Sequence, residues 1–468
     1  MAMGRRERSR QQQIFVDTSG LQTPGHPFYR RLNALLNEHG FDEFVEQLCA
    51  RFYDQKQGRP SIAPGVYFRM LLVGYFEGID SERGIAWRSA DSLALREFLG
   101  FVLDQSPPDH SSVSRTRRRL DLETHQQVFQ WILGVLAKQD LVEGKTLGID
   151  ATTLEANAAL RSIVRRDSGE SYNEYLNGLA KASGIETPSR TDRAKVDKKR
   201  PKKGSNDDWQ HPQDPDARIT KMKDGRTHLA HKLEHAVDMS TGAVIAVTVQ
   251  AATEGDSQTV TKTVAQAREA LTNLRESDRQ ASDELQELVM DRGYHSNATM
   301  MFLKQEGIRS YVAEPDRGRR RWKHQREAQL ATYANRRRIG GHRGKRLLRR
   351  RGQILERTFA HCLETGALRR IHLRHRHNAL KRALIHVGAF NLSLIMRNTL
   401  GAGTPRGLPQ RLARLLLSLQ RLSDRAMQHA AAVSRSRLLF PGAGGALRAA
   451  SAPGCYATRR LRSAAARG

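Results

Sequence analysis

A chain of 468 residues with a formal net charge of +29 and a pI near 10.7 is long enough for two domains and is strongly basic. Such a charge attracts polyanions, above all nucleic acid, and argues against an ordinary metabolic enzyme. The three cysteines lie far apart without CxxC spacing, and no apolar run reaches about 18 residues, which excludes a disulfide framework, a cysteine zinc site and a membrane span.

The N-terminal third predicts helices. Residues 1–20 are expected to form a mobile basic arm, and residues 21–141 an all-α domain, because apolar residues recur there at three- and four-residue spacing. The stretch PPDHSSVSRTRRRL predicts a turn, a capped start and a basic helix. This helix could read duplex DNA in a helix-turn-helix, or it could belong to a bundle with solvated arginines. Its candidate DNA contacts are Arg115, Arg117, Arg118 and Arg119.

From residue 145 the apolar pattern predicts strands. KTLGID predicts a strand ending in Asp150, and the polar, Lys-rich insertion 165–226 predicts a poor core former between strands. A hairpin follows, and then helices alternate with the strands ELVMD and IRSYVAE. The order over 145–398 fits a mixed sheet with flanking helices, as in the ribonuclease-H-like fold. We therefore expect an α/β catalytic domain after the helical one.

Three acidic residues stand out by position. Asp150 and Asp291 end the first and fourth predicted strands, and Glu356 lies in the first turns of the last predicted helix. Ionised carboxylates that are packed together repel unless cations compensate, and two Mg²⁺ ions, or Mn²⁺ in their place, would do so. With 49 acidic residues, an aspartate after a strand is also expected by chance. Asp238 precedes a turn, and Asp256 looks like a helix cap.

The same residues carry a family resemblance. The stretches GIDATTLEANAALRSIVRRD, HLAHKLEHAVD, VMDRGYHS and ERTFAHCLETGALRRIHLR closely resemble bacterial insertion-sequence transposases of the DDE type, in the group of the IS-four and IS-five relatives. The segment GHPFYRRLNALLNEHGFDEFVE is similar to that group's helical N-terminal domain. The resemblance implies a ribonuclease-H-like domain with Asp150, Asp291 and Glu356 as the catalytic, metal-binding triad.

Two departures from the family pattern concern the third acid and a later turn. Some relatives carry an Arg four residues before the catalytic Glu, where this chain has Gly352 and the nearest arginine is Arg351. Glu364, two helical turns after Glu356, is therefore the alternative third carboxylate. The pattern also usually has Gly where this chain has His375.

The segment 316–351 holds fifteen Lys or Arg residues against Asp316 and Glu327. It is expected to neutralise DNA phosphates, with base stacking by Trp322, or to be a disordered basic loop. Arg357 could clamp a phosphate or form an ion pair on the helix surface. The candidate DNA contacts here are Arg319, Arg320, Arg321, Trp322, Lys323, Arg336, Arg337, Arg338 and Arg357.

The histidines and the tail are less informative. Tyr294 and His295 could shape the site around Asp291 or simply begin a helix. We interpret His361, His372, His375 and His377 as polar packing or phosphate contacts, because a metal cluster would need carboxylates beside them.

The Arg- and Ala-rich tail 402–468 predicts one amphipathic helix, LPQRLARLLLSLQRL, followed by disorder. The tail could bind DNA or could be sequence read beyond the ancestral end of the gene.

Together these features predict a transposase that cleaves DNA at element ends and transfers the strands to a target. It would act on double-stranded DNA as a homo-oligomer, in the bacterial cytoplasm at the nucleoid and not at a membrane. No GxxxxGK[ST] motif occurs, so no ATP site is expected. The alternatives are a catalytically inactive DNA-binding repressor of transposition and a nuclease of the same fold.

Overall fold

The computed structural model describes residues 25–54, 61–102, 105–200, 205–222, 225–278, 282–316, 318 and 320–438. The chain as far as Pro409 forms one compact unit, and the chain from Gln410 onward forms another. The predicted arm 1–20 lies outside the described residues. The domain boundaries within the first unit stay a prediction.

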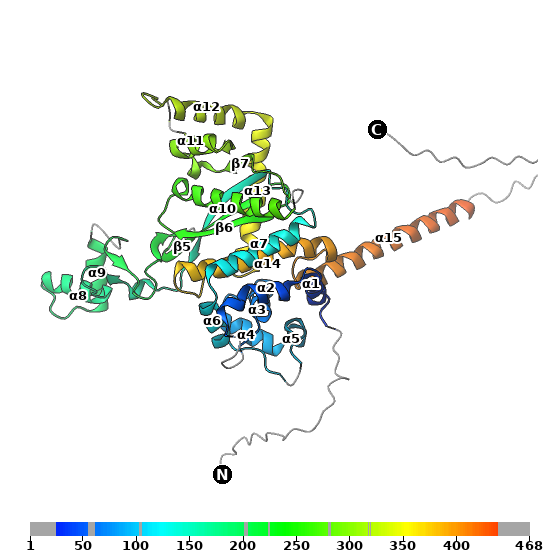
Figure 1. The fold of residues 1–468 in the computed structure, drawn as a ribbon, viewed down its shortest axis with the longest axis horizontal. Coiled ribbons are helices and arrows are strands. Elements are labelled where there is room, and N and C mark those ends of the chain that lie inside the picture. Colours follow the sequence, from blue (N-terminus) through cyan, green and yellow to red (C-terminus); the bar gives the residue numbers. More distant parts are fainter. Residues whose placement is uncertain are drawn as a thin grey trace, which may run out of the picture. The chain divides into compact units, whose positions relative to one another are not determined.

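Helices alone make up the N-terminal part of the described chain (Figure 1), as the sequence predicts. The apolar helix VYFRMLLVGYF is buried on nearly all sides, and its one charge, Arg69, pairs with Asp42. A buried charge needs such a partner. The elements are α1 (Pro27–Glu38), α2 (Phe41–Cys49), η2 (Ala50–Phe52), α3 (Pro64–Glu77), α4 (Glu82–Asp91), α5 (Leu93–Leu99), α6 (His110–Arg119) and α7 (Leu122–Ala137).

A mixed sheet forms the second part and confirms the predicted α/β architecture. Its order is β4-β5-β1-β7-β8, and β6 pairs with the same edge of β5 as β4 does. β5 and β6 pair antiparallel with their neighbours, whereas β7 and β8 run parallel to β1 after helical crossovers. The strands are β1 (Thr146–Glu155), β4 (Arg218–Lys221), β5 (Thr227–Asp238), β6 (Val244–Ala251), β7 (Glu287–Met290) and β8 (Arg309–Val312).

Helices cover both faces of this sheet. On one face, α13 (His342–Ala360) packs Leu355 against the backbone of Gly148 and stacks Phe359 on the His235 ring at 4.5 Å. On the other face, α10 (Asp256–Ser277) presents threonines to β5 and β6. The two faces of β5 therefore carry different chemistry, since successive side chains point to opposite sides.

Two asparagines close the edges of the sheet. Asn391 of α14 (Arg376–Leu400) accepts from Val244 N at 2.9 Å and donates to its carbonyl at 2.8 Å. Asn335 of α12 (Arg326–Gly340) brackets Val312 of β8 in the same way, at 3.0 and 2.8 Å. Each side chain thus replaces a missing strand, and the edge backbone stays paired.

α14 is the central helix of the first unit. It is long and apolar enough to cross a membrane, with a mean hydropathy of 1.2, but 94% of that stretch is buried inside the protein. Lys381 donates to the carbonyls of Arg117 and Leu120 at the end of α6, and Arg382 donates to that of Ile79. One core helix therefore packs against both the N-terminal helices and the sheet.

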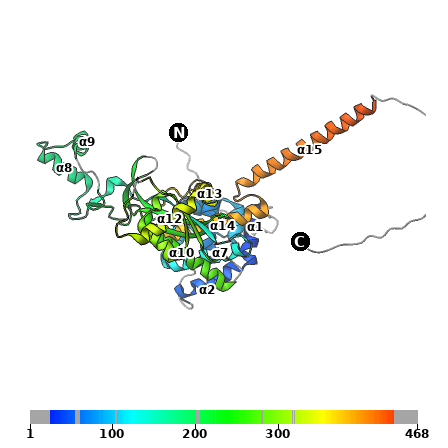
Figure 2. The same ribbon diagram turned by 90° about the horizontal axis from the view of Figure 1, so that it is seen from above.

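The insertion after β1 has its own small core, contrary to the sequence prediction of a poor core former. Trp209 is buried between Tyr172 and Tyr175, with ring centroids 5.0 and 5.3 Å apart, and it packs with Ile163 and Leu229. Figure 2 shows the two helices of the insertion, α8 and α9, side by side. Its elements are η3 (Leu160–Ser162), β2 (Val164–Arg165), α8 (Tyr172–Ala182), α9 (Arg190–Lys199) and β3 (Trp209–Gln210).

The basic segment and the tail are more helical than predicted. α12 and α13 occupy 326–340 and 342–360, so the alternative of a disordered basic loop is wrong for those residues. A π-helical turn, η5 (His361–Thr365), follows α13.

In the tail, α15 (Gly407–Leu438) runs beyond the predicted stretch and leaves several leucines exposed. Residues 439–468 lie outside the described part of the chain. The remaining elements are η4 (Arg292–Tyr294) and α11 (Asn297–Gln305).

The edge closure by Asn391 yields a stability prediction. Asn391→Ala leaves the buried N–H and C=O of Val244 unpaired, and we expect the free energy of unfolding to fall by roughly 2–4 kcal/mol. Asn398→Ala changes an exposed asparagine of the same helix and should have little effect. Chemical denaturation of the two variants tests this. Equal stability would show that Asn391 contributes nothing at the sheet edge.

Candidate functional site

Parallel pairing of β1 with β7 sets the two predicted aspartates side by side. The register joins Ile149 to Met290, so Asp150 and Asp291 are the next residues on adjacent strands. β1 does not end at Asp150 as predicted, because it continues to Glu155 along β5. β7 does end at Met290, and Asp291 caps the short turn η4. The two carboxylates therefore meet where the parallel pairing stops.

Burial and charge act in opposite directions on Asp150. Burial raises the pKa of its carboxyl group above the ordinary value, and the negative charge of Asp291 raises it further. The Arg351 guanidinium opposes this, with Nη1 2.9 Å from Asp150 Oδ2, and so does the Ala151 amide, which donates to Oδ1 at 2.9 Å. A cation is thus already placed against the first aspartate, supplied by α13.

Asp291 is held by a glycine turn. Its Oδ1 accepts from the Gly293 amide at 2.9 Å. A Cβ at Gly293 would stand 3.1 Å from that oxygen and would clash with Oδ2 of Asp256, so the turn leaves no room for a side chain. Asp256 is therefore a third acid against this turn. The sequence predicted it as a cap, but Gly255 occupies the N-cap position and Asp256 pairs with Lys232 at 2.6 Å.

A buried polar network supports that turn from the α10 face of the sheet. Lys232 and Glu234 are both buried in β5. Tyr294 donates to Glu234 Oε1 at 2.7 Å, Thr259 donates to the same oxygen at 2.9 Å, and Thr263 donates to Oε2. Burial raises the pKa values of both Glu234 and Tyr294.

This network was not predicted from the sequence. The sequence signal for this network was the pair of charged residues, Lys232 and Glu234, inside the apolar stretch HLAHKLEHAVD. A charged side chain in a buried strand is tolerated only when it has buried partners. Tyr294, for which two interpretations were open, is fully buried and contributes to this network.

Glu356 is placed differently from the two aspartates. It is exposed on α13, one residue after Leu355, which packs on Gly148, and five after Arg351, which binds Asp150. Its Oε1 turns back toward Gly352, lying 3.8 Å from where a Cβ there would stand. In the described chain the three carboxylates do not form a group within 4.8 Å of one another. The structure therefore brings Asp150 and Asp291 together and leaves Glu356 on the adjoining helix.

The alternative acid, Glu364, lies farther along. It is nine residues beyond Leu355, in the π-helical turn, and it forms an ion pair with Arg369. At about 1.5 Å of rise per residue, this is more than 10 Å away along the helix axis. The part of α13 that contacts β1, from Arg351 to Leu355, is thus next to Glu356 in the chain and farther from Glu364.

The oxygen donors here fit a hard divalent cation. Adjacent carboxylates, one of them already paired with a guanidinium, are the ligand type that Mg²⁺ and Mn²⁺ prefer. Burial is the main cause that raises the pKa of Asp150, the negative charge of Asp291 adds to it, and a bound cation would oppose both effects.

Several predicted DNA-contacting side chains have partners within the protein. Arg117 is buried and pairs with Glu82 at 2.8 Å, so it stabilises the helical part and is not a free phosphate contact. Arg336 pairs with Glu314 at 2.6 Å, and Arg338 donates to the Ser310 carbonyl at 2.8 Å. Arg320 bonds to Asn297 and lies over the ring of Trp322, 4.2 Å from its centroid.

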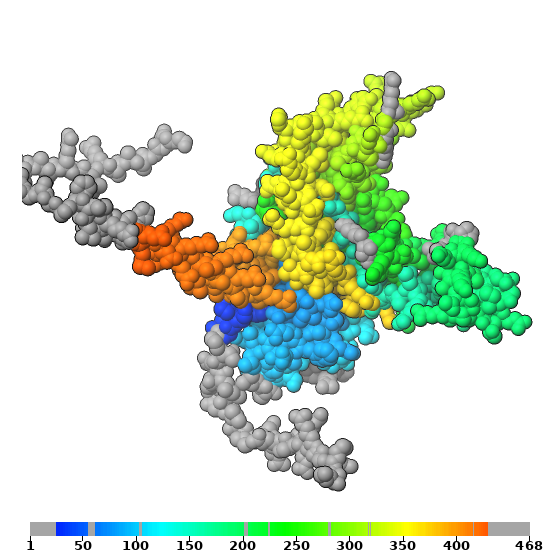
Figure 3. Space-filling view, turned by 180° about the vertical axis from the view of Figure 1, so that it is seen from behind, coloured from blue at the N-terminus to red at the C-terminus, as the bar shows by residue number. Residues whose placement is uncertain are grey.

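The other predicted contacts remain at the surface. The exposed residues are Arg115, Arg118, Arg119, Arg321, Lys323, Arg337 and Arg357, and Arg319 lies outside the described residues. Figure 3 shows α13 (yellow) along one face of the protein. On that face Arg357 lines a hollow with Arg350 and Arg397. An arginine-lined hollow of this kind suits a phosphate group.

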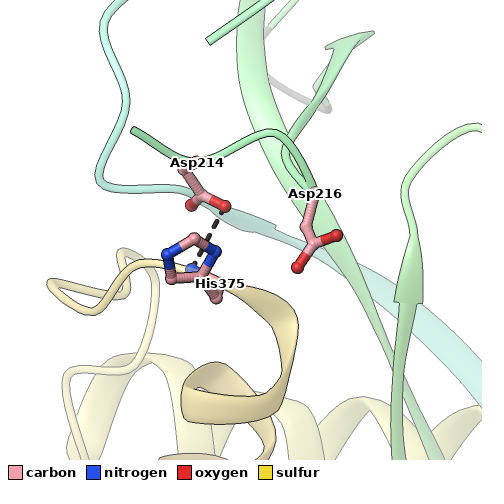
Figure 4. A group of neighbouring side chains, drawn as sticks. All are labelled: Asp214, Asp216 and His375. Carbon is pink, nitrogen blue, oxygen red and sulfur yellow. Dashed lines mark hydrogen bonds between the residues drawn. The ribbon is translucent and has the colours of Figure 1, made fainter. Parts of the chain in front are cut away.

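A second acidic group lies away from this pair of strands (Figure 4). Asp214, Asp216 and His375 place one ligand atom each within 4.8 Å of the others. From the sequence, a metal cluster at His375 was not expected, because no carboxylate stands beside that histidine in the chain. That reason was wrong, because folding brings two aspartates from the insertion to the start of α14.

Two family models match the chain. Residues 16–119 match the model described as Transposase domain (DUF772), and residues 183–392 match the Transposase DDE domain. The second match contains Asp291 and Glu356 and begins after Asp150. No curated protein and no solved structure matches the chain.

The electrostatics of Asp150 yield a pH prediction. Its raised pKa means that ionisation is less favourable in the folded chain than in the unfolded chain, so stability falls as pH rises through the ordinary value of 3.8 toward the folded-state value. Asp150→Asn should therefore raise the midpoint of thermal unfolding at pH 7, by about 1–3 °C. The gain should shrink as the pH approaches 3.8. A lower midpoint at every pH would show that the contact with Arg351 dominates.

Proposed function

Because the chain belongs to the DDE-type transposases, we propose that it cleaves DNA at the ends of an insertion sequence and joins the freed strands to a target. Asp150, Asp291 and Glu356 are the proposed catalytic acids. The observation that carries this assignment is the β1–β7 register, which makes the two aspartates neighbours beneath α13. The membership of the chain in the IS-four or IS-five group stays a prediction.

The proposed triad would hold two Mg²⁺ ions, with Mn²⁺ as a substitute. When bound, such ions activate the attacking oxygen and stabilise the leaving oxygen of an in-line phosphodiester displacement. The protein's own part is to hold Asp150 and Asp291 side by side and to bring Glu356 to them. Glu356 is next in the chain to Leu355, which contacts β1 as Arg351 does, and the proposal requires its carboxylate to turn toward the aspartates when metal binds.

Arg351 has a distinct role in this proposal. Before a cation is bound, its guanidinium neutralises Asp150 at 2.9 Å. A divalent ion on the same carboxylate would repel the guanidinium, and the freed side chain would then lie beside the scissile phosphate. Arg351 is thus proposed as a positioning residue that exchanges a carboxylate for a phosphate.

The basic surfaces would hold the DNA. The exposed arginines of α6 are proposed to contact element ends, and the hollow lined by Arg350, Arg357 and Arg397 is proposed to hold backbone phosphate near the triad. Synapsis of two element ends would need a homo-oligomer on DNA. We expect this to take place in the bacterial cytoplasm, at the nucleoid.

The alternatives differ in their products. An inactive repressor would bind element ends without cutting them, and a nuclease of the same fold would cut without joining. The joining step is proposed to follow when the freed 3′-hydroxyl attacks a second phosphodiester, with no covalent link to the protein.

Substitution of the third acid is the sharpest test of the triad. Glu356→Gln should lower strand cleavage by about 100-fold or more with Mg²⁺, because several kcal/mol of transition-state stabilisation would be lost. Glu364→Gln is the matched control on the same helical segment and should cleave normally. The readout is cleavage and joining of a labelled duplex that carries an element end. Loss of activity in Glu364→Gln alone would move the third carboxylate to that residue.

Substitution of Asp291 separates catalysis from DNA binding. Asp291→Asn should abolish cleavage while the affinity for the element end stays within about two-fold, since the residue faces cations and not the duplex. Gel-shift and cleavage assays on the same preparation measure both. If binding and cleavage fall together, Asp291 is structural.

Neighbouring arginines of α6 test the DNA-binding surface. Arg118→Ala removes an exposed charge, so the salt slope of DNA binding should fall by about 0.9 with little change in stability. Arg117→Ala removes a buried arginine and leaves the half-buried Glu82 without its partner, so it should lower the free energy of unfolding by roughly 2–4 kcal/mol. Salt-dependent binding and denaturation measure the two effects. If Arg118→Ala leaves the slope unchanged, α6 does not contact DNA.

A further inference from the structure

The group of Asp214, Asp216 and His375 lies where the end of the insertion meets the first turn of α14 (Figure 4). Asp214 and Asp216 lie in the stretch before β4, and His375 is the N-cap residue of α14. This group shares no residue with the proposed triad.

Helix capping explains only half of these two carboxylates. Asp214 Oδ1 accepts from the His375 amide at 3.1 Å, and Asp216 Oδ2 accepts from the Arg376 amide at 3.0 Å. Those bonds satisfy two donors at the start of α14. The second oxygen of each aspartate is left over. Asp214 Oδ2 is buried without a hydrogen bond, and Asp216 Oδ1 has only a distant Arg376 guanidinium at 3.7 Å.

A buried histidine marks the same place. His231 of β5 is fully buried, as is Asp214, and its Nε2 lies 3.5 Å from Asp214 Oδ2. That contact is long for a hydrogen bond, and the other ring nitrogen, Nδ1, has no hydrogen-bond partner in the described chain. The pair is incompletely satisfied, because its one contact is long and His231 Nδ1 has none; buried polar groups in that state call for an explanation, such as an ion on the carboxylate.

The ligand chemistry favours a transition-metal ion. An imidazole with two carboxylates suits Zn²⁺ or Mn²⁺ better than Mg²⁺, which prefers oxygen ligands alone. His375 holds its imidazole there at φ 68°, a backbone conformation that favours glycine.

We propose that Asp214, Asp216 and His375 bind one divalent transition-metal ion, with Zn²⁺ as the reference ion. His231 orients Asp214 from behind, as second partners of metal ligands commonly do. The bound ion joins the stretch before β4 to the start of α14, so it fixes the insertion on the core helix. The site is structural and is independent of the proposed DNA chemistry.

The test uses the full-length protein with Asp150→Asn and Asp291→Asn, so that the proposed triad does not compete for the metal. After the protein is stripped of metal, Zn²⁺ is titrated by calorimetry, and thermal unfolding is followed with and without the ion. We expect one equivalent to bind and the unfolding midpoint to rise with Zn²⁺ concentration.

His375→Gly in this background is the decisive variant. It should weaken Zn²⁺ binding at least tenfold and remove the zinc-dependent rise. Its metal-free midpoint should be unchanged or higher, because glycine adopts φ 68° without strain. His372→Ala is the matched control, since His372 lies nearby but pairs with Asp80 and should leave binding intact.

A second variant guards against a folding defect. Asp216→Asn keeps an acceptor for the Arg376 amide and should also weaken Zn²⁺ binding. The proposal is overturned if the parent binds no Zn²⁺, or if both His375→Gly and Asp216→Asn bind it as tightly as the parent. In either case the two aspartates are helix caps alone.

Discussion

The parallel pairing of β1 with β7 is the constraint on which the rest of the site depends. It makes Asp150 and Asp291 neighbours on adjacent strands, and like charges at that spacing oppose folding unless a cation intervenes. Arg351 supplies a positive charge there. Its guanidinium reaches Asp150 from the face of the sheet that α13 covers. In the proposed function a divalent ion would take over this role from the guanidinium.

Buried polar groups hold this arrangement in register. Lys232, Glu234 and Tyr294 fix the turn after β7 from the opposite face of the sheet, so Asp291 is held by bonds that no substrate has to supply. Asn391 and Asn335 close the two sheet edges with side-chain amides in place of strands. Networks of this kind specify one packing, because any other would leave several buried groups unpaired.

Sequence alone predicted what depends on periodicity and strand ends. The helical N-terminal part, the order of the strands and the adjacency of Asp150 to Asp291 all follow from short-range patterns and the rule for parallel sheets. Contacts between distant segments were beyond reach. Nothing in RRRGQILER says that Arg351 meets Asp150, and the separation of 161 residues between Asp214 and His375 hid their contact.

The partners of the charged residues were beyond reach for a related reason. A run of arginines gives no indication of which side chains pair within the protein, as Arg117, Arg336 and Arg338 do. Their contact with DNA stays a prediction. The insertion was judged by its polarity, yet one tryptophan and two tyrosines suffice for a small core.

Convergence of three acids on one cation site is the central claim, and local cleavage of the polypeptide by bound iron tests it most directly. Fe²⁺ loaded into the full-length protein, with ascorbate and peroxide, generates radicals that cut the backbone beside the ion. The account predicts cuts next to Asp150, Asp291 and Glu356 together, all suppressed by excess Mg²⁺. Cuts near the two aspartates without any near Glu356, or no cuts that Mg²⁺ suppresses, would contradict it.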